Sequence, residues 1–292
     1  MQFSVSSYSF QQHIRAGKMT QFDCIAKAKD LGFDAIEFID LIDETGEKPP
    51  LEIQKELAKQ LRAEADRVGL PINAYTVGAC LYQDTQEKLD AEVERLKGQL
   101  EVARILGAQV LRHDVCYQLG KTGASRSFDL MLPTIASAAR RVTKYGEGLG
   151  IRTCSENHGY IAQDSDRVER LFNAVAHDNF GLLVDIGNFV CVDEDPAAAV
   201  SRVAPYAIHV HLKDMLVRPA PTGSCKAMTR GGNYFCGTVV GEGDVPVAQC
   251  LRILKRAGYD GWLTLEYEGP EDCISGIRRG LQNAEAILQQ LS

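Results

Sequence analysis

Four acidic or imidazole side chains follow apolar runs in the second half of the chain. Glu156, Asp185, His211 and Glu266 each stand at or near the end of a short β-rich segment. A carboxylate that ends an apolar strand is costly to bury without a partner, and neighbouring carboxylates repel one another. A divalent cation between them removes both costs. The pattern therefore predicts one metal ion held by these four residues.

The mixture of three carboxylates and one imidazole indicates the kind of metal. Oxygen-rich ligation with one histidine suits Mn²⁺, and Mg²⁺, Co²⁺ and Zn²⁺ are the alternatives. Each residue alone has a plainer explanation, because an isolated acidic residue after a strand often caps a helix and a lone histidine often packs in a core. The metal site is favoured because the four residues fall on consecutive predicted strands, at the same end of each.

These residues can converge only if the strands that carry them are parallel neighbours. Short β-rich runs alternate with longer helical patterns about eight times along the chain, which is typical of repeated βαβ units. The expected strands are Phe3–Phe10, Ala35–Ile39, Pro71–Val77, Gln109–Val115, Ile151–Asn157, Phe180–Ile186, Ala207–Leu212 and Trp262–Tyr267. The expected helices are Gln21–Leu31, Leu51–Val68, Thr85–Leu106, Phe128–Tyr145 and Ile274–Leu291.

Glycine stands at the end of several helical patterns, where its left-handed conformation stops a helix at little cost. These glycines are Gly32, Gly69, Gly107, Gly150 and Gly258. Repeated units without an early glycine-rich phosphate loop favour a closed (β/α)₈ TIM barrel over an open doubly wound sheet. We expect a single barrel domain over residues 1–292, with its active site at the carboxyl ends of the strands.

Further polar residues are expected at the same mouth of the barrel, where they would contact a substrate. The predicted substrate-binding residues are Tyr8, Glu37, His113, His158, Asn188, Lys213 and Arg218. Lys213 and His158 are also candidates for shuttling protons, although each can instead be a supporting or surface residue. Trp262 starts its strand and is expected to be structural.

The connection from Met215 to Pro246 is longer than an ordinary loop. Loops of this length are usually lids or binding loops, and the alternative is a passive surface excursion. It carries Arg218, Lys226 and Arg230, which are able to bind a phosphate group.

The composition disfavours several classes of function. The 292 residues are 45% hydrophobic, enough for a large core, and the net charge of −7 disfavours nucleic acid as a partner. No run approaches the ~18 apolar residues of a membrane span, and no signal peptide is expected at the N-terminus. The nine cysteines, none of them in a CxxC motif, are expected to be buried thiols in a reducing cytoplasm.

Several segments, taken in order, resemble those of a known family. They are Ser155–Gly159, Leu183–Phe189, His209–Asp214, Gly241–Val245 and Gly258–Tyr267. As an ordered set they make nearly the whole chain similar to the xylose-isomerase-like barrel superfamily, in its sugar phosphate isomerase/epimerase group. That superfamily includes ketose 3-epimerases, inosose isomerases and dehydratases, and hydroxypyruvate isomerases. The resemblance implies a small carbohydrate substrate, and a homo-oligomer is one assembly that it allows.

The resemblance to ketose 3-epimerases also implies that the four predicted ligands bind the metal. It further implies that Glu156 and Glu266 act as acid and base on opposite faces of the substrate. Two positions depart from that pattern: Asn188 stands where those enzymes carry a histidine, and Val217 where they carry an arginine, with Arg218 next to it. These departures argue against a plain free-ketose 3-epimerase.

We therefore expect a divalent-metal-dependent sugar isomerase or epimerase. One glutamate would remove a proton next to a metal-bound carbonyl, and the resulting enediolate would be reprotonated. A metal-dependent dehydratase of a keto-inositol or keto-sugar shares that first step and is the main alternative. An endonuclease-like relative would need more histidines than the six present. A non-catalytic sugar-binding protein would not need two proton-transfer groups.

Overall fold

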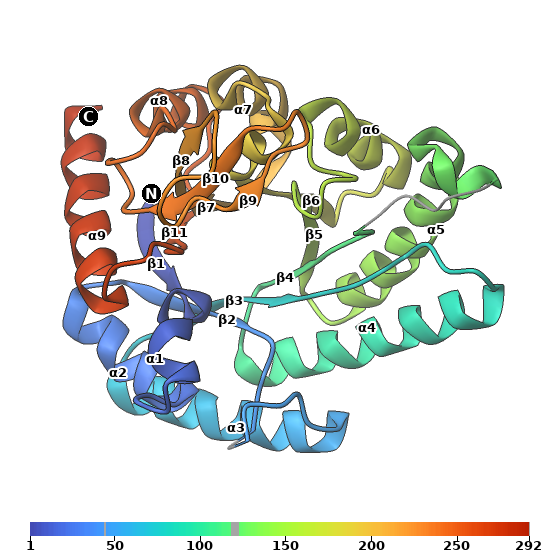
Figure 1. Ribbon diagram of the computed structural model, residues 1–292. Helices are drawn as coiled ribbons and strands as arrows, with labels where there is room; N and C mark the ends of the chain where they lie inside the picture. The colour runs from blue at the N-terminus through green and yellow to red at the C-terminus, as the bar shows by residue number, and fades with distance from the viewer. Residues whose placement is uncertain (44, 118–122, 292) are drawn as a thin grey trace. The chain divides into compact units, whose positions relative to one another are not determined.

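The computed structural model describes residues 1–43, 45–117 and 123–291. In these residues, parallel strands close into a barrel in the order β1-β11-β7-β6-β5-β4-β3-β2 (Figure 1). The barrel strands are β1 (Gln2–Ser6), β2 (Ala35–Ile39), β3 (Ile72–Val77), β4 (Val110–His113), β5 (Arg152–Glu156), β6 (Phe180–Asp185), β7 (Ala207–Leu212) and β11 (Trp262–Leu265). The predicted (β/α)₈ barrel is confirmed.

Helices alternate with these strands along the chain. They are α1 (Gln11–Arg15), α2 (Gln21–Leu31), α3 (Leu51–Val68), α4 (Gln86–Leu106), α5 (Phe128–Gly148), α6 (Ser165–Val175), α7 (Pro196–Val203), α8 (Val247–Arg256) and α9 (Cys273–Gln290). Helix α8 illustrates their packing, because Val247, Cys250, Leu251 and Leu254 are buried at helical spacing and form one apolar face. Within the described ranges, no helix has the length and apolarity that crossing a bilayer requires.

The chain divides into two compact units. The first unit comprises Met1–Ile36 and Val184–Ser292, and the second comprises Glu37–Leu183. In the first unit, β11 pairs with β1 and with β7 in parallel register. In the second unit, β4 pairs with β3 and with β5, and β5 pairs with the first residues of β6. The single domain over residues 1–292 stays a prediction.

The glycine joints are as the sequence predicts. Gly32, Gly69 and Gly107 are the C-caps of α2, α3 and α4, and all three have positive φ. Gly150 and Gly258 follow the C-caps of α5 and α8, with φ of +72° and +85°. Side chains other than glycine rarely adopt this region, so glycine allows each helix to end sharply before the next strand.

The first predicted strand, Phe3–Phe10, is too long. The strand ends at Ser6, and Ser7–Phe10 form a 3₁₀ helix. The reason is local, because the Ser6 hydroxyl accepts a hydrogen bond from the backbone N–H of Tyr8 at 3.4 Å and caps the turn. Tyr8 therefore lies after the strand and not on it.

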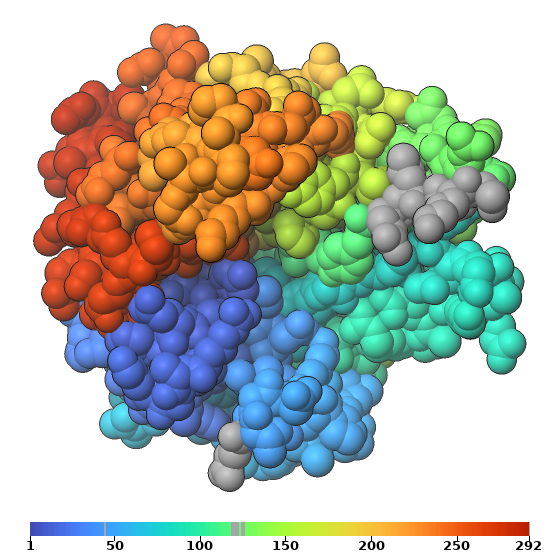
Figure 2. Space-filling model, viewed as in Figure 1, coloured from blue at the N-terminus to red at the C-terminus, as the bar shows by residue number. Residues whose placement is uncertain are grey.

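The long connection after β7 is not an irregular loop. It forms a three-stranded antiparallel sheet in the order β8-β10-β9, made of Asp214–Arg218, Tyr234–Thr238 and Ala227–Met228. The side chain of Asp214 accepts from the backbone N–H groups of Gly241, Gly243 and Val245 at 2.9–3.1 Å, which ties the sheet to the Gly-Glu-Gly turn. Figure 2 shows the residues of this segment, in orange, at the surface of the face that faces the viewer.

Two cysteines of this sheet correct the expectation that all nine are thiols. Cys225 and Cys236 form a disulfide. The pairing depends on the sheet, because β10 carries Cys236 and an isolated bridge between Thr222 and Cys225 turns the chain back toward it. The cysteine pattern consequently no longer argues for a reducing compartment. The other seven are free, and six of them are buried as expected.

Candidate functional site

Three of the four predicted ligands lie together in the first unit. Asp185 ends β6, His211 lies in β7, and Glu266 directly follows β11. Backbone hydrogen bonds hold them at one level: the N–H of Ile186 donates to the carbonyl of His211 at 3.2 Å, and that of Glu266 donates to Leu212 at 3.0 Å. The carboxyl ends of neighbouring parallel strands therefore bring the three side chains together.

The three side chains bring their ligand atoms close to one another. His211 Nδ1 lies 3.7 Å from Glu266 Oε2 and 3.9 Å from Asp185 Oδ2, beyond hydrogen-bonding range. Each residue offers a ligand atom within 4.8 Å of the others, and all three residues are buried. Ligand atoms that share one cation at about 2.0–2.2 Å lie roughly 3–3.6 Å apart, so this spacing is close to that of a metal site.

Backbone donors orient Asp185. Its Oδ1 accepts from the N–H groups of Gly187 at 2.7 Å and Asn188 at 3.0 Å, and its Oδ2 lies 3.2 Å from Lys213 Nζ. Glycine is required at position 187, because a Cβ there would lie 2.7 Å from the carbonyl oxygen of Lys213. The Asp-Ile-Gly-Asn turn thus fixes one carboxylate oxygen and leaves the other facing the cluster.

Lys213 brings positive charge to these carboxylates. It directly follows β7 and is buried. Its ammonium pairs with Glu266 and lies 3.6 Å from Glu268 Oε1. It also donates to Asn188 Oδ1 at 3.3 Å. The predicted residues Lys213 and Asn188 are therefore brought together with three of the predicted ligands, and Glu268 joins them although the sequence did not single it out.

The charges of this cluster act on its titratable groups. Burial raises the pKa of Glu266, but Lys213 and His211 outweigh burial and hold that pKa well below its ordinary range. Glu266 is therefore ionised at neutral pH, the form that ligates a cation. Burial raises the pKa of the Tyr8 hydroxyl, and Glu268 and Glu266 raise it further. Tyr8 lies in the field of these carboxylates and keeps its proton at neutral pH, so it can donate a hydrogen bond.

The fourth predicted ligand belongs to a second buried ion cluster, in the second unit. Glu156 ends β5, and its Oε2 lies 2.5 Å from Arg112 Nη2. The same guanidinium nitrogen lies 3.0 Å from Asp114 Oδ1. Asp114 also accepts from the Tyr117 hydroxyl at 2.6 Å and lies 2.9 Å from His158 Nδ1. The predicted residues Glu156 and His158 are thus linked through Arg112 and Asp114.

Arg112 and Asp114 set the charges of this cluster. Burial raises the pKa of Asp114, but Arg112 and then His158 outweigh burial and lower it to about 2. Burial lowers the pKa of His158, and Asp114 raises it by more, so that the net shift is upward. His158 consequently carries more positive charge at neutral pH than a free histidine does.

Arg112 was not among the sequence-predicted site residues. The sequence feature that could have revealed Arg112 is its charge within the predicted strand Gln109–Val115. The structure shows that Arg112 is buried in β4. The neighbouring predicted residue, His113, is fully buried and its Nδ1 lies 2.9 Å from the carbonyl of Asp114. Burial lowers the pKa of His113, so its ring is neutral at neutral pH.

Two predicted residues remain, Glu37 and Arg218. Glu37 is fully buried in β2. Arg218 ends β8, where its guanidinium pairs with Asp244 at 3.0 Å and donates to the carbonyl of Val217. This pair is part-exposed and belongs to the small sheet. Arg218 remains a predicted substrate contact.

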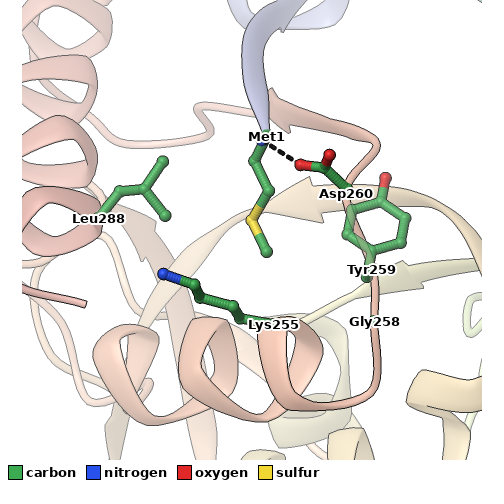
Figure 3. Close-up of a pocket in the computed structure, with 6 residues that line it drawn as sticks. All are labelled: Met1, Lys255, Gly258, Tyr259, Asp260 and Leu288. Carbon is green, nitrogen blue, oxygen red and sulfur yellow. Dashed lines mark hydrogen bonds and ion pairs between the residues drawn. The ribbon is translucent and has the colours of Figure 1, made fainter. Parts of the chain in front are cut away.

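A surface pocket of about 500 Å³ lies elsewhere in the first unit (Figure 3). Its lining residues are Met1, Lys255, Gly258, Tyr259, Asp260 and Leu288. The N-terminal ammonium of Met1 pairs with Asp260 at 2.5 Å. The pocket lies at the amino ends of β1 and β11, whereas Glu266 follows the carboxyl end of β11. It is therefore separate from the candidate site.

A family model described as the xylose isomerase-like TIM barrel matches residues 25–290 of the chain. The chain belongs to this family. Membership accounts for the closed barrel and agrees with the resemblance carried by the segments around Glu156, Asp185, His211 and Glu266.

Two named relatives match parts of the chain. The rhizopine catabolism protein MocC of Rhizobium meliloti is 29% identical over 222 residues, which cover 71% of this chain and 66% of that protein. An inosose dehydratase of Clostridium botulinum (strain Alaska E43 / Type E3) is 23% identical over 163 residues, which cover 54% of each chain. The matched regions span less than two thirds of either relative.

Two solved structures share the fold. An L-ribulose 3-epimerase superimposes with a TM-score of 0.72 at 16% identity, covering 99% of this chain and 95% of that one. The IolI protein with a bound zinc atom gives a TM-score of 0.73 at 14% identity, covering 100% and 98%. The same barrel thus occurs in an epimerase and in a protein with a bound zinc atom, so the fold alone is compatible with more than one function.

Proposed function

We propose that this protein is a divalent-metal-dependent isomerase or epimerase that acts on a sugar or keto-sugar. The observation that carries the proposal is the buried cluster of Asp185, His211 and Glu266 at neighbouring strand ends. The Nδ1 atom of His211 lies 3.7 Å from Glu266 Oε2 and 3.9 Å from Asp185 Oδ2. Two carboxylates and an imidazole form a donor set that fits a divalent cation, and we favour Mn²⁺, with Mg²⁺, Co²⁺ and Zn²⁺ as alternatives.

Glu156 is the proposed fourth ligand. In the pairing of β5 with β6, Glu156 lies opposite Leu183, two residues before Asp185. Residues two apart on a strand share a face, so this register supports a common side for Glu156 and Asp185. The resemblance of the surrounding segments to ketose 3-epimerases supports the same assignment.

The proposed chemistry is proton transfer next to a carbonyl. When bound, the cation would stabilise the negative charge that develops on the substrate as the proton leaves. Glu266 and Glu156 are the proposed bases, and ionised Glu266 can accept the proton at a carboxylate oxygen. Two bases on opposite faces give epimerisation, whereas one base that returns the proton to the adjacent carbon gives isomerisation.

The remaining predicted residues would bind and orient the carbohydrate. Lys213 and Asn188 lie against the cluster and can hold substrate hydroxyl groups. Tyr8 keeps its proton and is suited to donate to a substrate oxygen. The positive charge of His158 suits it to bind a hydroxyl or to return a proton. His113, Glu37 and Arg218 are retained as further candidates for the pocket wall.

A dehydratase acting on a keto-inositol or keto-sugar is the second candidate function. The similarity to several proteins named inosose dehydratase, at 23–26% identity, favours it. Such an enzyme would remove the same proton and then expel a hydroxyl group from the next carbon as water. A substrate that loses the mass of water would separate this reaction from isomerisation, which conserves mass.

The test combines metal analysis with exchange of solvent deuterium into a panel of keto-sugars. Glu266→Gln should bind less metal and lower the exchange rate by about 10³-fold, because it loses a ligand and a base together. Glu271→Gln is the matched control, because the Glu271 side chain is exposed and pairs with Arg279 at 2.8 Å. Full exchange in the Glu266 variant, with an intact circular-dichroism spectrum, would refute the two-glutamate mechanism.

A further inference from the structure

Lys213 lies between two sets of carboxylates. Its ammonium pairs with buried Glu266 and lies 3.2 Å from Oδ2 of buried Asp185. Glu268 Oε1 lies 3.6 Å from the same ammonium, and the side chain of Glu268 is 29% exposed. Asn188 Oδ1 accepts from the same ammonium at 3.3 Å. One buried cation thus has an inner pair of acidic partners and an outer one.

The inner partners are the oxygens that a metal would need. Glu266 Oε2 and Asp185 Oδ2 are the atoms that face His211, and they are also the atoms nearest the lysine ammonium. A divalent cation among them would repel the ammonium strongly at this distance in a buried site. Lysine is a compact charge on a flexible four-carbon stem, so it can exchange partners with little change in the backbone.

Glu268 is well placed to receive the displaced ammonium. The backbone of Glu268 lies against Gly237 of β10, where a Cβ would come within 2.7 Å of the Glu268 carbonyl group. This close approach fixes the base of the Glu268 side chain. The negative charge of Glu268 also raises the pKa of the Tyr8 hydroxyl, as the charge of Glu266 does, so both carboxylates act on the same tyrosine. The receiving carboxylate is therefore held near the site but outside the proposed ligand set.

We propose that Lys213 is an exchangeable counter-cation, which neutralises Asp185 and Glu266 in the metal-free protein and moves to Glu268 when a divalent cation binds. This inference rests on the proposed metal site. It makes Glu268 a positioning residue for Lys213, and it explains why three acidic side chains surround one lysine.

The test is the affinity of the whole protein for Mn²⁺ alone, measured from the free-ion signal in electron paramagnetic resonance. Lys213→Met should bind Mn²⁺ about tenfold more tightly, because it removes a competing charge. Glu268→Gln should bind about tenfold more weakly, because the ammonium loses its outer partner. In the Lys213→Met background, Glu268→Gln should have a smaller effect. Glu271→Gln, three residues further along the same loop, should match the wild type.

The outcomes separate this inference from the proposed function. If the wild type binds Mn²⁺ and Asp185→Asn does not, but Glu268→Gln behaves like Glu271→Gln, the metal site stands and the exchange is wrong. If the wild type binds neither Mn²⁺ nor Zn²⁺, the proposed function fails and the exchange fails with it. Glu268 is partly exposed, so its variant tests the inference even if Lys213→Met does not fold.

Discussion

The two units each contain a buried ion cluster, and the clusters differ in the cation that they use. In the first unit, the ammonium of Lys213 is shared among Glu266, Asp185 and Glu268, two of them at 3.2 and 3.6 Å. In the second unit, one guanidinium nitrogen of Arg112 lies 2.5 and 3.0 Å from its two carboxylates. Arginine presents a rigid fork of donors, whereas lysine is a movable point charge.

This difference indicates which cluster can rearrange its ion pairs when a ligand binds. Asp114 of the Arg112 cluster has further contacts with Tyr117 and His158, so that this carboxylate is well satisfied. Such a network holds Glu156 in one orientation. The Lys213 cluster offers alternative carboxylates within 4 Å of one cation. We therefore expect Arg112 and Asp114 to contribute mainly to stability, by holding the proposed ligand Glu156, and the Lys213 cluster to contribute mainly to ligand binding.

The largest effect on stability is expected from Arg112→Met. It should lower the free energy of unfolding by about 3–5 kcal/mol, because Glu156 and Asp114 would keep their charges in a buried site without the cation. Urea denaturation measures this. Arg141→Met is the control, because its ion pair with Asp90 is part-exposed and should contribute less than about 1 kcal/mol. Equal losses in the two variants would contradict the assignment of Arg112 to a buried network.

Lys213→Met tests the difference between the two clusters, because bound Mn²⁺ should restore the stability that this variant loses. This variant also leaves buried carboxylates without a cation, but Mn²⁺ can take the place of the ammonium. At 100 times its dissociation constant, a ligand that binds only the folded state adds about 2.7 kcal/mol to the free energy of unfolding. We expect Mn²⁺ to raise the melting temperature of the Lys213 variant more than that of Arg112→Met. A larger rise in the Arg112 variant would reverse the roles of the two clusters.

A smaller effect is expected from acid at Asp114. Its pKa is about 2 in the folded protein and about 3.9 when unfolded. Because the folded value is the lower one, the stabilisation is present above pH 4 and is lost as the pH falls toward 2. It amounts to about 2.6 kcal/mol in all, roughly half of it lost by pH 3. Urea denaturation between pH 6 and pH 3 should show a flatter dependence for Asp114→Asn than for the wild type.

The barrel was predictable because each of its repeated strand-helix units has its own sequence pattern over a short stretch of the chain. Each strand run and each terminal glycine can be recognised without knowing the rest of the fold, and Gly32, Gly69 and Gly107 do cap their helices. The strand ends followed from the same repeat, which is why Asp185, His211 and Glu266 were expected at one level. Residue type and position along a strand were sufficient for these features.

The remaining features depend on contacts between distant segments. Arg112 in an apolar strand can be judged only when the pairing of β4 with β5 places it opposite Cys154, two residues before Glu156. The small sheet was missed because β9 has only two residues, Ala227 and Met228, too few for a periodic pattern. The disulfide of that sheet was missed for the same reason, because pairing among nine cysteines is decided by the fold.

The smallest effect is expected from Arg218, which lies in the small sheet and outside both clusters. Its pair with Asp244 is part-exposed at 39% and 48%, so Arg218→Met should change the free energy of unfolding by less than about 1 kcal/mol. If Arg218 contacts the substrate, as its position in the sequence predicts, the KM should rise while the affinity for Mn²⁺ stays unchanged. Steady-state kinetics beside a Mn²⁺ titration separates the two. A change in Mn²⁺ affinity would instead link the small sheet to the Lys213 cluster, which Gly237 already contacts through Glu268.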